Sequence, residues 1–438
     1  MNYKIILTSI FFVVFFFWEI TVSFSDKGSP GRIDTTISEK DLYQTASGKK
    51  SYAELIKNSQ LNSRGKTEID NAIIDFMQEY GIVGSSVAVA KEGKLVYVNG
   101  YGYANIEANV PVDPTKLFRI ASVSKLITAT AVLKLVEEGR LELDDRVFGL
   151  HGILKDSIYL HYNDKRFERI TVQHLLRHTG GWSRIQGDPV FRPHVIARVM
   201  HAELPLQEEV LIAYALRKGL RYNPGTVYSY SNLGYIILGE IIEKVSGQDY
   251  EAYVKNQILH PLDIYDMHVG KSYYEDKFPR EVKYYEASTT PKTLGFDTFD
   301  EYYPRVYGGN NIELLGAAGG WVSTTADLMK FVLSVDGYQE VADILSKETL
   351  ELMVTPTSSR YTLMGWRGTD NRGTWWRTGT LTGSSALVVR QNNNIIWIVL
   401  VNTSTPLKSR IHSVVSRNMF RATYALDKWP ERDLLAIR

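Results

Sequence analysis

The chain of 438 residues contains no cysteine. This absence excludes disulfide bonds, thiolate metal sites, a cysteine nucleophile and a lipid anchor on an N-terminal cysteine. Basic and acidic side chains nearly balance, at 50 and 49, and they form no basic stripe, so we expect no nucleic-acid partner. The sequence also lacks internal repeats and the G-x-S-x-G nucleophile elbow of α/β-hydrolases. What is present is a chain long enough for one large domain or two.

An apolar run from Ile5 to Trp18 follows a single lysine near the start of the chain. Because a membrane-spanning helix needs about 20 apolar residues, this shorter run predicts a secretory signal peptide over residues 1–25. An uncleaved anchor is the alternative, since apolar residues continue beyond Glu19. In both cases we expect an exported protein, periplasmic or extracellular, which contacts a membrane only if this segment is retained. Residues 26–65 are polar and predict a poorly packed lead-in.

The remaining residues, 66–438, show strand patterns at both ends. A helix is expected from Lys66 to Tyr80, followed by a hairpin in "SSVAVAKEGKLVYVNGYG" that turns at Lys91-Glu92-Gly93. After Thr355 come the β-rich runs "TWWRTG", "SSALVVR" and "IIWIVLVN", and a closing helix begins near Pro406.

The middle of the chain is mostly helical in pattern between Ile170 and Leu262, whereas residues 267–318 look irregular. Another helix begins in "STTADLMKFVL", where Thr324 and Asp327 are spaced as a capping box. These patterns predict an α+β fold. We expect one antiparallel sheet from both chain ends, flanked by helices, with an inserted mostly helical lobe at about 140–290.

The first candidate for chemistry is "RIASVSKLIT", in which Ser122 and Lys125 are three residues apart. On a helix these two residues share a face, and the helix N-terminus favours developing negative charge. A partly buried lysine can take the proton of a serine and make it a nucleophile. The alternative is a helix-start serine with a lysine whose stem reaches solvent. Alone, this short pattern is weak.

Two further segments carry polar groups suited to such a site. In "YSYSNLGY", Tyr230 and Asn232 flank one residue of an extended segment and can enter one cleft together. A tyrosine between cations ionises more easily, and the asparagine can bind a substrate amide or orient Lys125. In "WWRTGTLTGSS", Arg377, Thr378 and Gly379 end a β-rich run. The alternatives are a packing tyrosine, a turn asparagine and an ordinary strand end.

The three motifs occur in the order SVSK, YSN and RTG, accompanied by "ITVQHLLRHTGGW", "PGTVYSYSNLGYIILGEIIEKVSG" and "AAGGWVSTTADLMKF". This sequence resembles the serine β-lactamase and penicillin-binding superfamily, and most closely its class C-like branch, which includes DD-peptidases, D-aminopeptidases and esterases. The resemblance runs from about Lys66 to the closing helix. It implies a β-lactamase/DD-peptidase-like fold.

The resemblance also implies roles for single residues. Ser122 would be the acylated nucleophile, Lys125 its base partner and Tyr230 a proton shuttle. Asn232 would contact substrate and lysine, and the N–H groups of Ser122 and Thr380 would form the oxyanion hole.

One residue departs from the pattern of the family. The third motif usually opens with lysine or histidine, and here it opens with Arg377. A guanidinium keeps the positive charge but cannot exchange a proton. We therefore expect Arg377, at the mouth of the cleft with Thr378, Gly379 and Thr380, to bind a substrate carboxylate.

Other sequence patterns give weaker evidence for a functional site. His174 and His178 have a spacing that suits zinc, but no HExxH pattern or third ligand accompanies them, so we expect no metal and no cofactor. The leading hypothesis is an exported serine hydrolase that acts through a Ser122 acyl-enzyme on a small-molecule or peptide substrate. The scissile bond is a peptide, ester or β-lactam amide, with a D-amino-acid peptide or a small ester favoured. The alternative is a non-catalytic penicillin-recognising receptor or binding protein.

Overall fold

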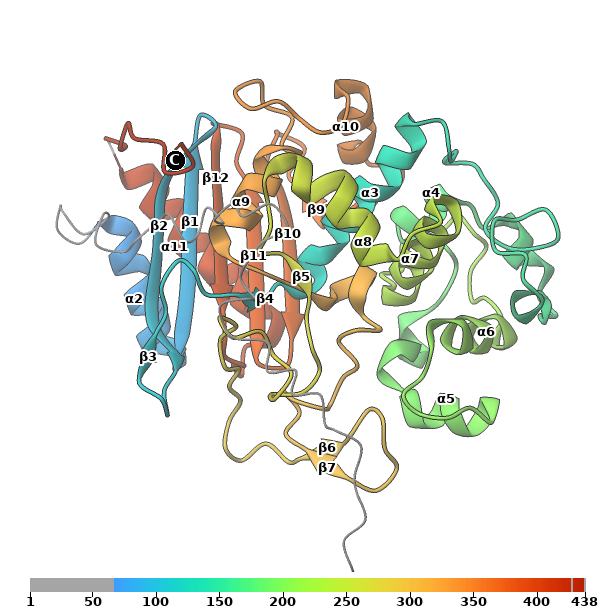
Figure 1. Ribbon diagram of the computed structural model, residues 1–438. Helices are drawn as coiled ribbons and strands as arrows, with labels where there is room; N and C mark the ends of the chain where they lie inside the picture. The colour runs from blue at the N-terminus through green and yellow to red at the C-terminus, as the bar shows by residue number, and fades with distance from the viewer. Residues whose placement is uncertain (1–66, 427, 437–438) are drawn as a thin grey trace, which may run out of the picture. The chain divides into compact units, whose positions relative to one another are not determined.

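The structure is a computed structural model that describes residues 67–426 and 428–436 (Figure 1). The expected signal segment at 1–25 and the expected lead-in at 26–65 therefore lie outside the described residues. Within the described ranges, no helix is both long and apolar enough to cross a membrane.

The centre of the fold is a seven-stranded antiparallel sheet in the order β3-β2-β1-β12-β11-β10-β9. Its strands are β1 (Gly84–Lys91), β2 (Lys94–Asn105), β3 (Val110–Pro111), β9 (Gly368–Thr369), β10 (Trp375–Leu381), β11 (Ser384–Arg390) and β12 (Ile395–Val401). The first and last strands of the described residues meet in the middle of the sheet, where Val87 of β1 lies opposite Val399 of β12. This arrangement confirms the expected α+β fold with one sheet made by both chain ends.

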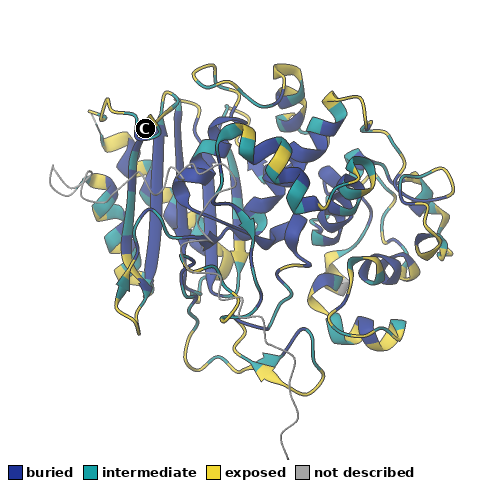
Figure 2. Ribbon diagram, viewed as in Figure 1, coloured by how far each residue is buried: buried dark blue, intermediate teal, exposed yellow. Residues whose placement is uncertain are grey.

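Both faces of the sheet are covered, which explains why β11 and β12 are buried along their whole length (Figure 2). Side chains of a strand alternate between the two faces. In β12, Trp397 and Val399 pack with α2 (Glu68–Tyr80) and α11 (Ile411–Ala425). Ile398 and Leu400 face the larger core on the other side, which includes α9 (Thr325–Leu333).

The helical lobe follows α3 (Ser124–Glu137), a helix that is buried on nearly all sides. The lobe contains α4 (Val172–Leu176), α5 (Pro193–Met200), α6 (Glu208–Lys218), α7 (Asn232–Ser246) and α8 (Tyr250–Val254). The remaining elements are α10 (Lys347–Val354), the three-stranded sheet of β4 (Phe118–Arg119), β8 (Trp321–Ser323) and β5 (His268–Val269), and the pair β6 (Thr293–Leu294) and β7 (Tyr302–Tyr303).

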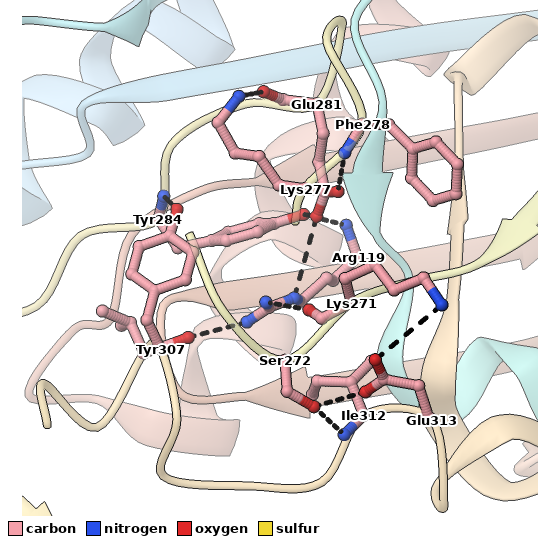
Figure 3. A network of polar contacts seen from close by, with 11 residues as sticks. Arg119, Lys271, Ser272, Lys277, Phe278, Glu281, Tyr284, Tyr307, Ile312 and Glu313 are labelled. Atoms are coloured by element: carbon pink, nitrogen blue, oxygen red, sulfur yellow. Dashed lines mark hydrogen bonds and ion pairs between the residues drawn. The ribbon is translucent and has the colours of Figure 1, made fainter. Parts of the chain in front are cut away.

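The mostly irregular segment 267–318 is tied to the core by a buried polar network (Figure 3). Its centre is Arg119 of β4, which donates hydrogen bonds of 2.8 Å to the carbonyl oxygens of Val306 and Lys271. The Arg119 guanidinium also lies 3.8 Å from the Glu281 carboxylate, and both side chains are buried. A buried charge is tolerated when it is paired and hydrogen-bonded. The network thus anchors the strand that leads into the S-x-x-K segment.

Candidate active site

Ser122 lies in a 3₁₀ turn, Ala121–Val123, that immediately precedes α3. Ala121 has φ 47°, in the left-handed region that is unfavourable for a residue with a Cβ atom. Strand β10 passes directly against this turn at Gly379. A Cβ atom at Gly379 would lie 2.3 Å from the Ile120 carbonyl oxygen and 2.9 Å from the Ser122 nitrogen. Only a glycine lets the strand come this close to the serine.

Lys125, one helical turn later, is completely buried. Its Nζ donates to the Ser122 Oγ at 3.3 Å and to the Asn232 Oδ1 at 2.7 Å, and it also donates to the Ala318 carbonyl. Burial lowers the pKa of Lys125 to about 8, although the neighbouring Tyr230 opposes this effect. The lysine is therefore held where it can accept the proton of a serine near neutral pH.

Tyr230 completes the contacts of the Ser122 side chain, since its hydroxyl donates to the Ser122 Oγ at 2.7 Å. Burial by itself would raise the pKa of Tyr230, but the positive charges of Lys125 and Arg377 outweigh it and lower that pKa to about 8. The serine hydroxyl thus faces two groups that both titrate near pH 8. As expected from the extended segment, Tyr230 and Asn232 enter the same site.

Four cations surround the ring of Tyr230. Their distances to the ring centroid are 5.0 Å for Lys125, 5.5 Å for Arg184, 5.8 Å for Arg367 and 5.9 Å for Arg377. This is a strongly positive environment, which favours a phenolate and any anionic part of a substrate.

The sequence led us to expect Arg377 at the mouth of the cleft, but the structure places it elsewhere. Its side chain is fully buried, and its Nε donates to the Ser122 carbonyl oxygen at 2.6 Å. One Nη donates to the Tyr230 hydroxyl at 3.2 Å. Alternate residues of β10 point to opposite faces, so Arg377 and Gly379 face the nucleophile turn while Thr378 lines the cleft. Arg377 therefore contacts Ser122 and Tyr230 from the interior of the protein.

The open edge of β10 lies beside the cleft. In the described part of the chain, β9 pairs only with Trp375 and Trp376, and the Trp376 carbonyl accepts from the Arg367 N–H on that side. Backbone groups of a strand alternate in direction, so the N–H groups of Thr378 and Thr380 point to the same edge. The Thr380 N–H therefore points toward the cleft, as the expected oxyanion hole requires.

Two contributors were missed by the sequence analysis. The His178 ring packs against the Tyr230 ring, with centroids 4.4 Å apart and planes tilted by 40°. Burial together with the charges of Arg377 and Lys125 holds the pKa of His178 well below its usual value. Asp188 accepts a 3.0 Å hydrogen bond from the Asn232 backbone N–H. The sequence analysis considered His178 only as a zinc ligand and did not consider Asp188, because only tertiary packing brings these residues to Tyr230 and Asn232.

His174 and His178 do not form a metal site together. His174 accepts from the Thr171 N–H at the start of α4, whereas His178 lies under Tyr230. No group of three His, Asp or Glu side chains suited to a metal occurs among the described residues. The absence of a cofactor stays a prediction.

The cleft above Ser122 has a volume of about 720 Å³. One of its walls carries Arg367, whose Nη1 donates to the Tyr228 hydroxyl at 3.0 Å and whose guanidinium lies 4.6 Å from the Tyr361 ring centroid. No carboxylate occurs among the described lining residues. They are Ser122, Arg184, Tyr230, Tyr361, Arg367, Trp376, Thr378, Thr380, Leu387, Ser409, His412, Ser413 and Ser416.

Known proteins resemble this chain in sequence and in fold. The curated relatives include Protein flp of Staphylococcus aureus (strain NCTC 8325 / PS 47), 28% identical over 359 residues that cover 78% of this chain and 65% of that protein. The putative penicillin-binding protein PbpX of Bacillus subtilis (strain 168) is 28% identical over 353 residues, which cover 80% of this chain and 76% of PbpX. The chain thus spans about 65% of the length of Protein flp.

Solved structures show the same fold. The octameric penicillin-binding protein homologue from Pyrococcus abyssi matches with a TM-score of 0.60 and 28% identity, over 84% of this chain and 79% of that one. The D-amino acid amidase from Ochrobactrum anthropi SV3 complexed with L-phenylalanine matches with a TM-score of 0.63 and 22% identity, over 82% and 99% of the two chains. The sequence profile of the Beta-lactamase family matches residues 69–414. The protein therefore belongs to the Beta-lactamase family.

Proposed function

We propose that the protein is an exported serine hydrolase that works through an acyl-enzyme on Ser122. The observation that carries this proposal is the pair of contacts at the Ser122 Oγ, 2.7 Å to the Tyr230 hydroxyl and 3.3 Å to the Lys125 Nζ. The Ser122 proton passes to this pair as the Oγ attacks a carbonyl carbon. The Ser122 and Thr380 N–H groups stabilise the oxyanion.

The rest of the reaction follows from the same groups. The bond to the leaving amine or alcohol breaks, the leaving group takes the proton, and the acyl group stays on the Ser122 Oγ. Water then attacks the ester, gives up a proton to the Lys125–Tyr230 pair, and releases a carboxylic acid and the free serine. No further reactant is needed.

For the substrate we propose a D-amino-acid peptide or a small ester that carries a carboxylate near the scissile bond. The cleft contains Arg184 and Arg367 and no described carboxylate, so an anionic group is attracted to it. Arg367, rather than Arg377, is the guanidinium placed to bind that carboxylate, because it lines the cleft. The D-amino acid amidase of Ochrobactrum anthropi shares the fold, which is compatible with this choice. A β-lactam amide is the remaining option.

Covalent labelling tests the proposal directly. A fluorophosphonate probe and a fluorescent β-lactam are incubated with the wild type, with Ser122→Ala and with Ser246→Ala, a matched control at the far end of α7. We expect at least one probe to label the wild type and the control at Ser122, found by mass spectrometry of the labelled peptide, and not to label Ser122→Ala. Saturable binding with no covalent label at all would instead favour the non-catalytic receptor.

A further inference from the structure

Asp188 lies in the loop before α5 and reaches the start of α7. Its Oδ2 accepts a hydrogen bond of 3.0 Å from the Asn232 N–H, and its Oδ1 accepts one of 3.3 Å from the Val190 N–H. Asn232 is the first residue of α7, and its Oδ1 accepts from the Lys125 Nζ at 2.7 Å. A continuous chain of contacts thus runs from the Asp188 carboxylate through Asn232 to the lysine beside the nucleophile.

Positive charges predominate around this chain of contacts. Burial raises the pKa of Asp188, while its two N–H partners and the charge of Lys125 oppose that rise. Asp188 in turn acts on Lys125 in the direction of a higher pKa. The carboxylate therefore supplies negative charge to a site dominated by cations.

The groups that face the Lys125–Tyr230 pair come from several elements. Arg377 approaches from β10, Arg184 from the loop that also carries Asp188, and Arg367 from the residue before β9. His178, after α4, packs its ring against Tyr230, and burial lowers the pKa of His178. The Tyr235 ring of α7 also faces the pair, with its centroid 5.4 Å from the Lys125 Nζ. Against the cations, the Asp188 carboxylate acts on Lys125 with a negative charge.

We propose that Asp188 is a positioning residue of the acyl-transfer site. Its carboxylate holds the first residue of α7, so that the Asn232 amide oxygen stays hydrogen-bonded to the Lys125 ammonium. Its negative charge opposes the surrounding cations, which favour loss of a proton from the Lys125–Tyr230 pair. This role rests on the proposed function, because it concerns the base that activates Ser122.

Two variants separate the hydrogen bonds from the charge. Asp188→Asn keeps one accepting oxygen for the Asn232 N–H but removes the charge, whereas Asp188→Ala removes both. Loss of a negative charge makes the pair lose a proton more easily, so the acid limb of the rate profile moves to lower pH in both variants, by about half to one pH unit. The plateau rate falls about tenfold in Asp188→Ala, because the hydrogen bond that positions the Asn232 N–H is lost, and much less in Asp188→Asn, which keeps an oxygen for that N–H.

The experiment measures the second-order rate of fluorophosphonate labelling of Ser122 as a function of pH, together with the melting temperature. Asp249→Asn is the matched control, since Asp249 caps α8 through the Ala252 N–H and lies outside this chain of contacts. It should leave the pH profile in place.

The outcomes separate this inference from the proposed function. Acid limbs shifted to lower pH in both Asp188 variants, with the Asn variant faster than the Ala variant, support the positioning role. If both Asp188 variants are labelled with the same acid limb and the same plateau rate as the wild type, the positioning role is overturned. This holds even if the melting temperature falls, because a purely structural residue gives that result. A wild type that no probe labels overturns the proposed function, and the role of Asp188 with it.

Discussion

Replacing Arg377 by methionine removes the buried charge next to Tyr230 while keeping an unbranched side chain. The guanidinium carbon lies 5.9 Å from the Tyr230 ring centroid. At an effective dielectric constant of about 20, two unit charges at this distance interact by about 3 kcal/mol, or about two pH units. The charge of Arg377 lowers the pKa of both Lys125 and Tyr230, so its loss raises both.

The consequence is a shift of the acid limb of kcat/KM to higher pH. Because both groups have pKa values of about 8, a shift of about two pH units lowers the rate at pH 7 by up to about a hundredfold. The rate is recovered at alkaline pH. Neutral esters and substrates with a free carboxylate should lose rate equally, because the affected groups act on the serine and not on the substrate.

Matched variants make the assay decisive. The pH profile of kcat/KM is measured with a free acid and its methyl ester, for Arg377→Met, Arg377→Lys and Arg367→Ala. Arg377→Lys keeps the charge and should keep the limb near its original position. Arg367→Ala should weaken the free acid by about ten- to a hundredfold and shift the limb less, because solvent screens the partly exposed Arg367. If Arg377→Met instead loses only the free acid, with an unmoved limb, Arg377 binds the carboxylate and the reasoning is wrong.

Four further outcomes follow from substitutions of single residues. Ser122→Ala should lower turnover on the order of 10⁶-fold with an unchanged melting temperature, and Tyr230→Phe by about 10²–10⁴-fold in the same assay; near-wild-type turnover would remove either residue from the mechanism. Gly379→Ala should lose activity, because its Cβ would lie 2.3 Å from the Ile120 carbonyl oxygen; full activity would mean that β10 can move away from the turn. Glu281→Ala should cost about 3–5 kcal/mol in urea unfolding, since the buried Arg119 loses its partner; a loss below about 1 kcal/mol would contradict this.

Local patterns account for the parts of the fold that the sequence predicted well. The hairpin turn at Glu92-Gly93 has φ values of 51° and 74°, as a tight turn between strands requires. The predicted capping box at Thr324 is half formed. Thr324 accepts from the Asp327 N–H, but the Asp327 carboxylate accepts from the Thr324 hydroxyl and not from its backbone N–H.

The candidate site was predictable where spacing along one element decides contact. Ser122 and Lys125 meet because they are one helical turn apart. The direction of Arg377 was not predictable, because it depends on which face of β10 meets the nucleophile turn. The roles of His178 and Asp188 were missed for the same reason, since packing of the helical lobe brings His178 to Tyr230 and Asp188 to Asn232.

The pairing of β1 with β12 has a consequence for how the protein is made. The Val83 N–H donates to the Thr403 Oγ1 across 320 residues of sequence, so the central strands cannot join until all the residues between them have been synthesised. Contacts between such distant residues require closure of a very long loop before they yield any stabilisation, which slows folding. During that interval the apolar edge of the N-terminal hairpin is exposed to other chains. A chain that ends before β12 would leave this edge permanently open and prone to aggregation.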